Sequence, residues 1–231
     1  MENTYLKHLI ESPLVYYVYK RGSTIYGTNT EESDLDFLVV VDSTYKVPKA
    51  FKRFKQVNRC DHLNYKVVLD NCEFIFYEIQ DWFQHVLNCK IDAWECACLN
   101  KKYIFKEHVK LLMETNPLKL RLNFDQFEKD TFGRAWFHLC KDNYKMAKKW
   151  LWYVIKNAAL TNQILINHKI VNFAEVAAEH DLLFNAENKV ETLIPLYEEL
   201  LKKYKNFLKQ STDGVKKQYY LNKYKEEHKD E

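Results

Sequence analysis

The rest of the chain is organised around the stretch Arg21–Val41, RGSTIYGTNTEESDLDFLVVV. It contains Gly22-Ser23, a polar loop, and the carboxylates Asp34 and Asp36 of a DLD triplet that leads into the apolar run FLVVV. Side chains of a strand alternate between its two faces, so Asp34 and Asp36 are predicted to share one face. Two neighbouring carboxylates repel each other unless a cation lies between them. The pair is therefore predicted to form half of a divalent metal site.

The Gly22-Ser23 pair is predicted to lie in a turn between a strand and a short helix. The preceding residues 14–19, LVYYVY, are rich in β-branched and aromatic side chains and indicate a strand, and residues 23–27 indicate a short helix. A glycine and a hydroxyl residue at the start of a helix present backbone N–H groups to a phosphate. One segment is thus predicted to hold both a phosphate cradle and metal-binding carboxylates.

The first half of the chain mixes helices and strands, which is typical of the α+β class. An amphipathic helix is predicted before Pro13, and CEFIFYEI at residues 72–79 predicts a strand with Glu73 near its start. Helices are predicted at residues 3–12, 80–87 and 92–98, with the segment 104–112 after them, and strands at residues 14–19, 35–41, 64–70 and 72–79.

The second half carries no convincing strand signal after Asn123. Helical periodicity predicts helices at residues 124–141, 143–165, 172–180 and 186–209. Pro117 and its polar neighbours indicate a boundary near residues 113–123. The predicted organisation is a catalytic domain at 1–116, a helical substrate-binding domain at 117–212, and a charged tail at 213–231 with the composition of a disordered terminus.

Composition and charge limit the classes of protein to which the chain can belong. The chain has 231 residues, 47% hydrophobic content and a net charge of +3. The whole chain has 35 Lys+Arg and 32 Asp+Glu. Residues 134–231 hold 17 of the basic residues and 13 of the acidic ones, so the basic excess lies in the C-terminal part of the chain. This excess suits a substrate with phosphates, and a solvated lysine-rich helical surface would give the same count.

The sequence indicates neither a membrane span nor a structural metal. No run approaches 18 apolar residues, and the N-terminus lacks the order of a signal peptide, so we expect a cytoplasmic protein without a membrane partner. The six cysteines form no CxxC pair and have no histidine at finger spacing, which argues against zinc and predicts buried reduced thiols.

Gly22-Ser23, ten intervening residues, and the DLD triplet resemble the signature of the polymerase-β-like nucleotidyltransferase superfamily. The fuller stretch GSTIYGTNTEESDLD, with Gly27 and Ser33, is similar to the variant in bacterial and phage nucleotidyltransferases associated with RNA ligases. Further likenesses follow in order along residues 15–170, namely Glu73, Trp82-Phe83, Trp94-Glu95 and the segment KMAKKWLWYVIKNAALTNQILINHKI. The resemblance implies a minimal nucleotidyltransferase fold, a mixed palm-like sheet with flanking helices, followed by an all-helical domain.

The resemblance also implies two-metal catalysis. Asp34 and Asp36 would bridge two Mg²⁺ ions about 3.5–4 Å apart, with Mn²⁺ as an alternative cation. Glu73 would complete the second site or take the proton of the acceptor. Glu78 is the rival third carboxylate, but it lies five residues further on and faces the opposite side of a regular strand.

Lysines of the second half are candidates for binding the nucleotide. Lys145, Lys148 and Lys149 are predicted to share one helical face, where they could bind nucleotide phosphates or an RNA backbone. A solvated lysine face is an equally good interpretation. Where the family has a His and an Arg along this helix, this sequence has Lys149 and Trp152.

The sequence thus predicts an enzyme that moves a nucleoside monophosphate from an NTP to a hydroxyl and releases pyrophosphate. By analogy with the RNA-ligase-associated relatives, the expected acceptor is RNA, for example a tRNA 3′ end. Two alternatives stay open: transfer to a protein or a small molecule, and a catalytically silent nucleic-acid-binding module. The oligomeric state is not predicted.

Overall fold

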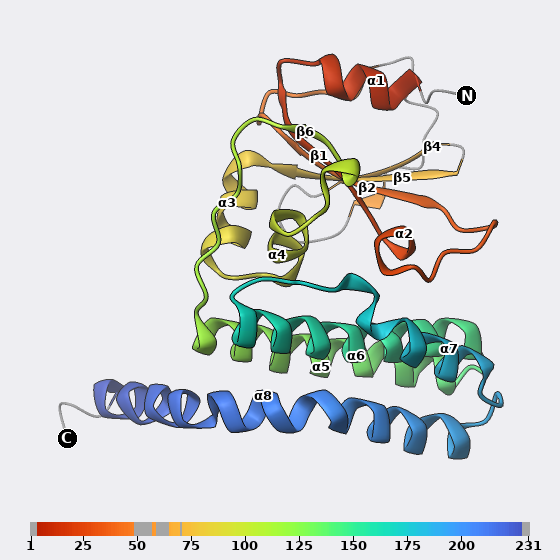
Figure 1. Cartoon of the computed structure of the whole chain (residues 1–231), viewed down its shortest axis with the longest axis vertical. Coiled ribbons are helices and arrows are strands. Elements are labelled where there is room, and N and C mark those ends of the chain that lie inside the picture. The colour runs from red at the N-terminus through yellow and green to blue at the C-terminus, as the bar shows by residue number, and fades with distance from the viewer. Residues whose placement is uncertain (1–3, 49–56, 59–64, 70, 228–231) are drawn as a thin grey trace. The chain divides into compact units, whose positions relative to one another are not determined.

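The computed structural model describes residues 4–48, 57–58, 65–69 and 71–227. The chain forms two compact units (Figure 1). The first comprises Met1–Asn88 and Asp92–Met113, and the second comprises Cys89–Ile91 and Glu114–Glu231. The lysine-rich stretch at residues 49–55 lies outside the described residues, as does Cys60.

The first unit is built on a mixed six-stranded sheet with the order β3-β4-β5-β2-β1-β6. Among the strands that the structure describes, β2 and β5 alone pair in parallel, and they form the centre of the sheet with β1 beside β2. The other pairs are antiparallel. The strands are β1 (Val15–Arg21), β2 (Leu35–Val41), β3 (Val57–Asn58), β4 (Tyr65–Leu69), β5 (Cys72–Glu78) and β6 (Ile104–Glu107).

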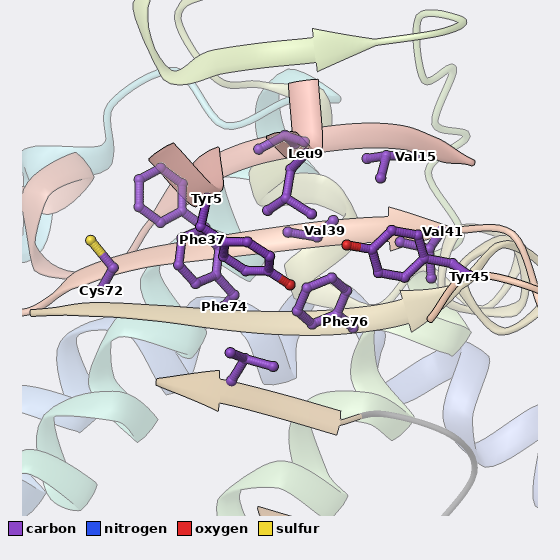
Figure 2. Packing of buried hydrophobic residues seen from close by; sticks show 12 residues of the cluster. Tyr5, Leu9, Val15, Phe37, Val39, Val41, Tyr45, Cys72, Phe74 and Phe76 are labelled. Carbon is purple, nitrogen blue, oxygen red and sulfur yellow. The ribbon is translucent and has the colours of Figure 1, made fainter. Parts of the chain in front are cut away.

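One face of the sheet packs against helix α1 (Thr4–Glu11). Figure 2 shows Tyr5 and Leu9 of α1 over the alternate residues of β2 and β5 that point to this side. The ring of Tyr5 lies edge-on to Phe74, with the centroids 5.0 Å apart. The period-two alternation of β2 and β5 therefore commits one set of side chains to a core, and the other set, which includes Asp36 and Glu73, points to the opposite face.

That opposite face is covered by α3 (Ile79–Leu87) and α4 (Ile91–Ala97). Trp82 of α3 is fully buried and packs against Tyr77 of β5, while Trp94 of α4 is almost fully buried. A continuous apolar strand needs a cover on both faces, and these helices supply the second cover. The α+β architecture predicted from the sequence is confirmed.

The edge strand β6 is a feature that the sequence did not predict. Residues 104–107 pair antiparallel with β1, and their side chains alternate between half-buried and exposed. An edge strand has a neighbouring strand on one side only, and none of the four residues of β6 is fully buried. So short and weakly apolar a segment is not distinguished from the neighbouring helices by its sequence.

The second unit is helical. The helix α6 (Tyr144–Asn167) is the most deeply buried and packs against α5 (Pro117–Leu139), α7 (Ala177–Asn185) and α8 (Val190–Glu227). A short helical turn, Phe173–Val176, precedes α7. Pro117 begins α5 rather than interrupting it, because the first helical position has no intrahelical N–H bond to lose.

Residues 213–227, which the charge pattern assigns to a tail, continue α8 as helix. Side chains near residue 213 attach this helix to α5. Arg121 of α5 donates hydrogen bonds to Thr212 (3.0 Å) and Asp213 (2.6 Å), and Lys216 pairs with Asp125. These contacts join residues about 90 positions apart in sequence, so no local pattern predicts them.

Two further expectations concern cysteines and membranes. The described cysteines, Cys72, Cys89, Cys96, Cys98 and Cys140, carry thiols rather than disulfides, and the first three are buried. Within the described ranges, no helix combines the length and the apolar character that crossing a membrane requires.

Candidate active site

The Gly22-Ser23 turn joins β1 to the four-residue helix α2 (Ser23–Tyr26). Gly22 has φ +74°, and Gly27, which follows α2, has φ +72°. Both values lie in the region that glycine adopts without steric cost. The side chain of Asp36 fills the space where residue 22 would carry a Cβ atom. The turn therefore lies directly against one of the predicted metal ligands, as a shared site for phosphate and cation requires.

Asp36 and Glu73 are direct register partners on the parallel strands β2 and β5. Partners in register point to the same face, so the two half-buried carboxylates lie side by side. Asp34 is exposed and comes directly before β2. Glu78 pairs with Val41 at the far end of the same strands. The structure thus places Glu73, rather than Glu78, beside Asp36.

A lysine that sequence reasoning missed also lies on this face. Lys66 of β4 forms an ion pair with Glu73, and both side chains are mostly buried, with exposed fractions of 29% and 21%. Strand alternation around residues 65–69 would have placed Lys66 on one face, but only the pairing of β4 with β5 brings it to Glu73. The ammonium group balances the charge of the Glu73 carboxylate in this arrangement.

The carboxylates provide the donors that Mg²⁺ prefers. Hard divalent cations are held by carboxylate oxygens, and Asp36 and Glu73 supply them from neighbouring strands. Among the residues that the structure describes, no three His, Cys, Asp or Glu side chains converge as a complete cage. Mg²⁺ is usually bound through one or two carboxylates together with substrate phosphates and water, so a partial set of protein ligands fits this ion.

Beneath the turn lies a buried glutamate, Glu95 of α4, which is 1% exposed. One carboxylate oxygen accepts a hydrogen bond from the Arg21 guanidinium, and the other accepts one from the Tyr26 hydroxyl. Burial and the Glu95 charge both raise the pKa of Tyr26. Burial lowers the pKa of Arg21, but the charge of Glu95 outweighs it and the net shift is upward. Arg21 therefore stays charged and Tyr26 stays a neutral donor.

A second polar cluster is centred on Asp92, in the first turn of α4. Its carboxylate accepts a hydrogen bond from the Tyr77 hydroxyl (3.1 Å) and lies 3.0 Å from Nδ1 of His85. Burial raises the pKa of Asp92, but the hydrogen bond and the charge of His85 prevail and lower this pKa to about 2. The cluster ties α3, α4 and β5 together on the face that carries Asp36.

The three predicted lysines of α6 differ in their surroundings. Lys145 and Lys149 are exposed, and the Lys149 ammonium lies 5.8 Å from the centroid of the Tyr153 ring. Lys148 is buried, and its ammonium group donates to the carbonyl oxygens of Phe184 (3.1 Å) and Ala186 (2.7 Å). The expected single accessible face of three lysines is therefore incorrect for Lys148, whose side chain holds the end of α7 instead.

The mixed sheet, with a Gly-Ser turn and paired carboxylates at one end of its central strands, defines the first unit as a nucleotidyltransferase fold. Residues 3–114 match the family model described as nucleotidyltransferase domain. This part of the chain belongs to that family, within the polymerase-β-like superfamily.

Comparison with other proteins gives distant structural likenesses. A nucleotidyltransferase-like protein from Exiguobacterium sibiricum 255-15 is similar over 92% of this chain and 77% of its own, with 12% identity and a TM-score of 0.34. An aminoglycoside 6-adenyltransferase from Bacillus subtilis is similar over 92% of this chain and 93% of its own, with 8% identity and a TM-score of 0.30. No curated protein sequence matches the chain.

Proposed function

We propose that the protein is a Mg²⁺-dependent nucleotidyltransferase that moves a nucleoside monophosphate from an NTP to a hydroxyl of RNA, such as a tRNA 3′ end, and releases pyrophosphate. The observation that carries the transfer reaction is the register pairing of Asp36 with Glu73, next to the Gly22-Ser23 turn. The Asp36 side chain occupies the space that a Cβ atom on residue 22 would need. A metal ligand, a second carboxylate and a phosphate-binding turn thus lie within one corner of the sheet.

The roles follow from the chemistry of each group. Asp34 and Asp36 would hold Mg²⁺, with Mn²⁺ as an alternative, and Glu73 would complete the site or accept the acceptor's proton. The cation would supply Lewis-acid polarisation of the phosphoryl oxygens. Lys66 pairs with Glu73, so the Glu73 carboxylate already has one cationic partner on this face of the sheet.

The transfer step makes one bond to phosphorus and breaks one. The acceptor hydroxyl oxygen bonds to the α-phosphorus while the bond from that phosphorus to the bridging oxygen breaks, and pyrophosphate leaves with the electron pair. The proton of the acceptor hydroxyl passes to Glu73 or to water. Gly22 lets the backbone approach the triphosphate, and Ser23 offers a hydroxyl and an N–H group to it. The N–H groups of the turn then face the charge that develops on the pyrophosphate.

RNA is the acceptor that the second unit supports best. Lys145 and Lys149 of α6 are exposed, and Lys149 lies near the ring of Tyr153, so cations and an aromatic ring occur together. Exposed lysines bind phosphates as point charges, and aromatic rings stack with bases. We leave Lys148 out of the proposed contacts because its ammonium group is bound to two carbonyl oxygens.

A labelling experiment tests the proposal. The protein is incubated with Mg²⁺ and each α-labelled NTP, in separate reactions with total RNA, lysate protein or a small-molecule extract. We expect label on RNA, and its loss in the Asp34→Ala, Asp36→Ala double variant, which should stay folded because Asp34 is exposed and Asp36 is half-buried. EDTA should abolish the same signal.

The other outcomes separate the alternatives. Label on a polypeptide or a small molecule would keep nucleotidyl transfer and overturn RNA as the acceptor. Wild-type rates in the double variant would overturn the metal assignment. The absence of label in every reaction would overturn the enzyme and leave a silent binding module.

A further inference from the structure

Glu95 joins the two ends of the Gly22-Ser23 turn. Arg21 is the last residue of β1 and directly precedes Gly22, and Tyr26 is the last residue of α2 and directly precedes Gly27. Each of these side chains donates to a different oxygen of the Glu95 carboxylate. One buried side chain on α4 therefore fixes the start and the end of the turn together.

The turn depends on contacts from outside the turn, such as those of Glu95 with Arg21 and Tyr26. A helix of four residues does not form by itself, since the nucleus of a helix is unfavourable without further packing. Within α2 the backbone offers only short-range bonds, such as the Ile25 N–H to the Gly22 carbonyl at 3.2 Å. The contacts of Glu95 with Arg21 and Tyr26 supply the long-range connection, across 74 and 69 residues of sequence.

The contacts of Glu95 with Arg21 and Tyr26 also set the position of the turn relative to Asp36. Arg21 is the register partner of Asp36 on the neighbouring strand, and Gly22 lies against the Asp36 side chain. A shift of Arg21 or α2 would therefore change the distance between the phosphate-binding backbone and the metal-binding carboxylate. Catalytic geometry is sensitive to displacements of this kind.

We propose that Glu95 is a positioning residue, which holds the Gly22-Ser23 turn in the geometry that binds the triphosphate of the NTP. The inference rests on the proposed nucleotidyl transfer. Glu95 itself is too deeply buried to contact the substrate, so its effect is carried by Arg21 and Tyr26.

A purely structural role is the competing explanation, because a buried glutamate with two donors also stabilises the fold. The second unit offers a matched control. Glu179 of α7 is 4% exposed, and it accepts hydrogen bonds from Lys203 and Tyr204, both at 2.6 Å. It resembles Glu95 in burial and in its pairing with one cation and one tyrosine, and it is not part of the proposed site.

The experiment compares Glu95→Gln, Tyr26→Phe and Glu179→Gln in the full-length protein. Binding of the α,β-methylene analogues of ATP, GTP, CTP and UTP with Mg²⁺ is measured by calorimetry, and KM and kcat are measured with total RNA and the labelled NTP whose analogue binds. We expect Glu95→Gln to weaken analogue binding and raise KM about tenfold or more, the effect of a lost charge-assisted hydrogen bond. Glu179→Gln should lower the thermal midpoint and leave KM unchanged.

Tyr26→Phe keeps the inference testable if Glu95→Gln does not fold. It removes one hydrogen bond to Glu95 and retains the ion pair between Glu95 and Arg21. It should therefore fold, and it should raise KM by a smaller factor than Glu95→Gln. Wild-type binding and KM in both variants would overturn the inference and leave the proposed function intact. An equal rise in KM for Glu179→Gln would also overturn it, whereas a wild-type protein that binds none of the four analogues would overturn the proposed function itself.

Discussion

The Cγ atom of Asp36 lies 2.7 Å from the position that a Cβ atom would occupy at residue 22. Real Cβ atoms do not approach other atoms so closely, so any larger residue at position 22 would force the Asp36 side chain to shift. Since Gly22 also has φ +74°, two independent constraints select glycine there.

Gly22→Ala should therefore impair both folding and transfer. The positive φ alone costs about 1–2 kcal/mol for an alanine, and the overlap with Asp36 forces a further shift of the carboxylate. We expect a transfer rate at least about tenfold lower, measured with labelled NTP under saturating Mg²⁺.

Gly27→Ala is the matched control, because Gly27 has φ +72° and no neighbouring atom lies within 4 Å of the position that its Cβ atom would take. It should cost the backbone penalty alone and keep the transfer rate. Equal rates in the two alanine variants would show that contact with Asp36 does not matter.

The sequence predicts the elements around Asp36 well for a physical reason. From residue 37 onward the strand at residues 35–41 is continuously apolar because it is buried on both faces, whereas the first residues of the strand at 72–78 alternate because one face is more deeply buried. Both patterns leave a local signature in the sequence. The glycine and the two carboxylates form an ordered local motif, so the turn and Asp36 could be recognised before the strands were paired.

The contacts that complete the site are long-range, and the sequence does not reveal them. Lys66 reaches Glu73 only because β4 pairs with β5, and Glu95 reaches Arg21 only because α4 covers this face of the sheet. The motif resemblance marks Trp94-Glu95 without giving it a role. Likewise, Lys148 has the same spacing as its exposed neighbours, and only the end of α7 distinguishes it.

The two candidate third carboxylates should behave differently. Glu73 is the register partner of Asp36, whereas Glu78 is the partner of Val41. We expect Glu73→Gln to lower kcat by on the order of a hundredfold or more, the range of a lost general base or metal ligand. Glu78→Gln should remain close to the wild-type rate. A larger loss for Glu78→Gln would move the third carboxylate to the far end of β5.

Substitution of Lys148 should affect the stability of the protein, whereas substitution of Lys149 should affect RNA binding. Lys148→Met leaves the carbonyl oxygens of Phe184 and Ala186 without their donor, so it should lower the free energy of unfolding by about 1–3 kcal/mol in urea titrations. Lys149→Met should leave this free energy unchanged and weaken RNA retention. The slope of log affinity against log salt should fall by about one for Lys149→Met. A stable Lys148→Met with weakened RNA retention would reverse the assignment.

Acid should weaken the first unit through Asp92. Its pKa is about 2 in the folded protein, below the ordinary value of 3.8, so the folded state binds this proton less readily than the unfolded state does. The resulting stabilisation is complete above about pH 4 and is lost as the pH falls towards 2. The difference corresponds to about 2 kcal/mol.

The free energy of unfolding from urea titrations at about pH 2–5 should therefore fall more steeply for the wild type than for Asp92→Asn, which has no carboxylate to protonate. Parallel pH profiles for the two proteins would mean that the hydrogen bonds of Asp92 to His85 and Tyr77 do not favour its charged form.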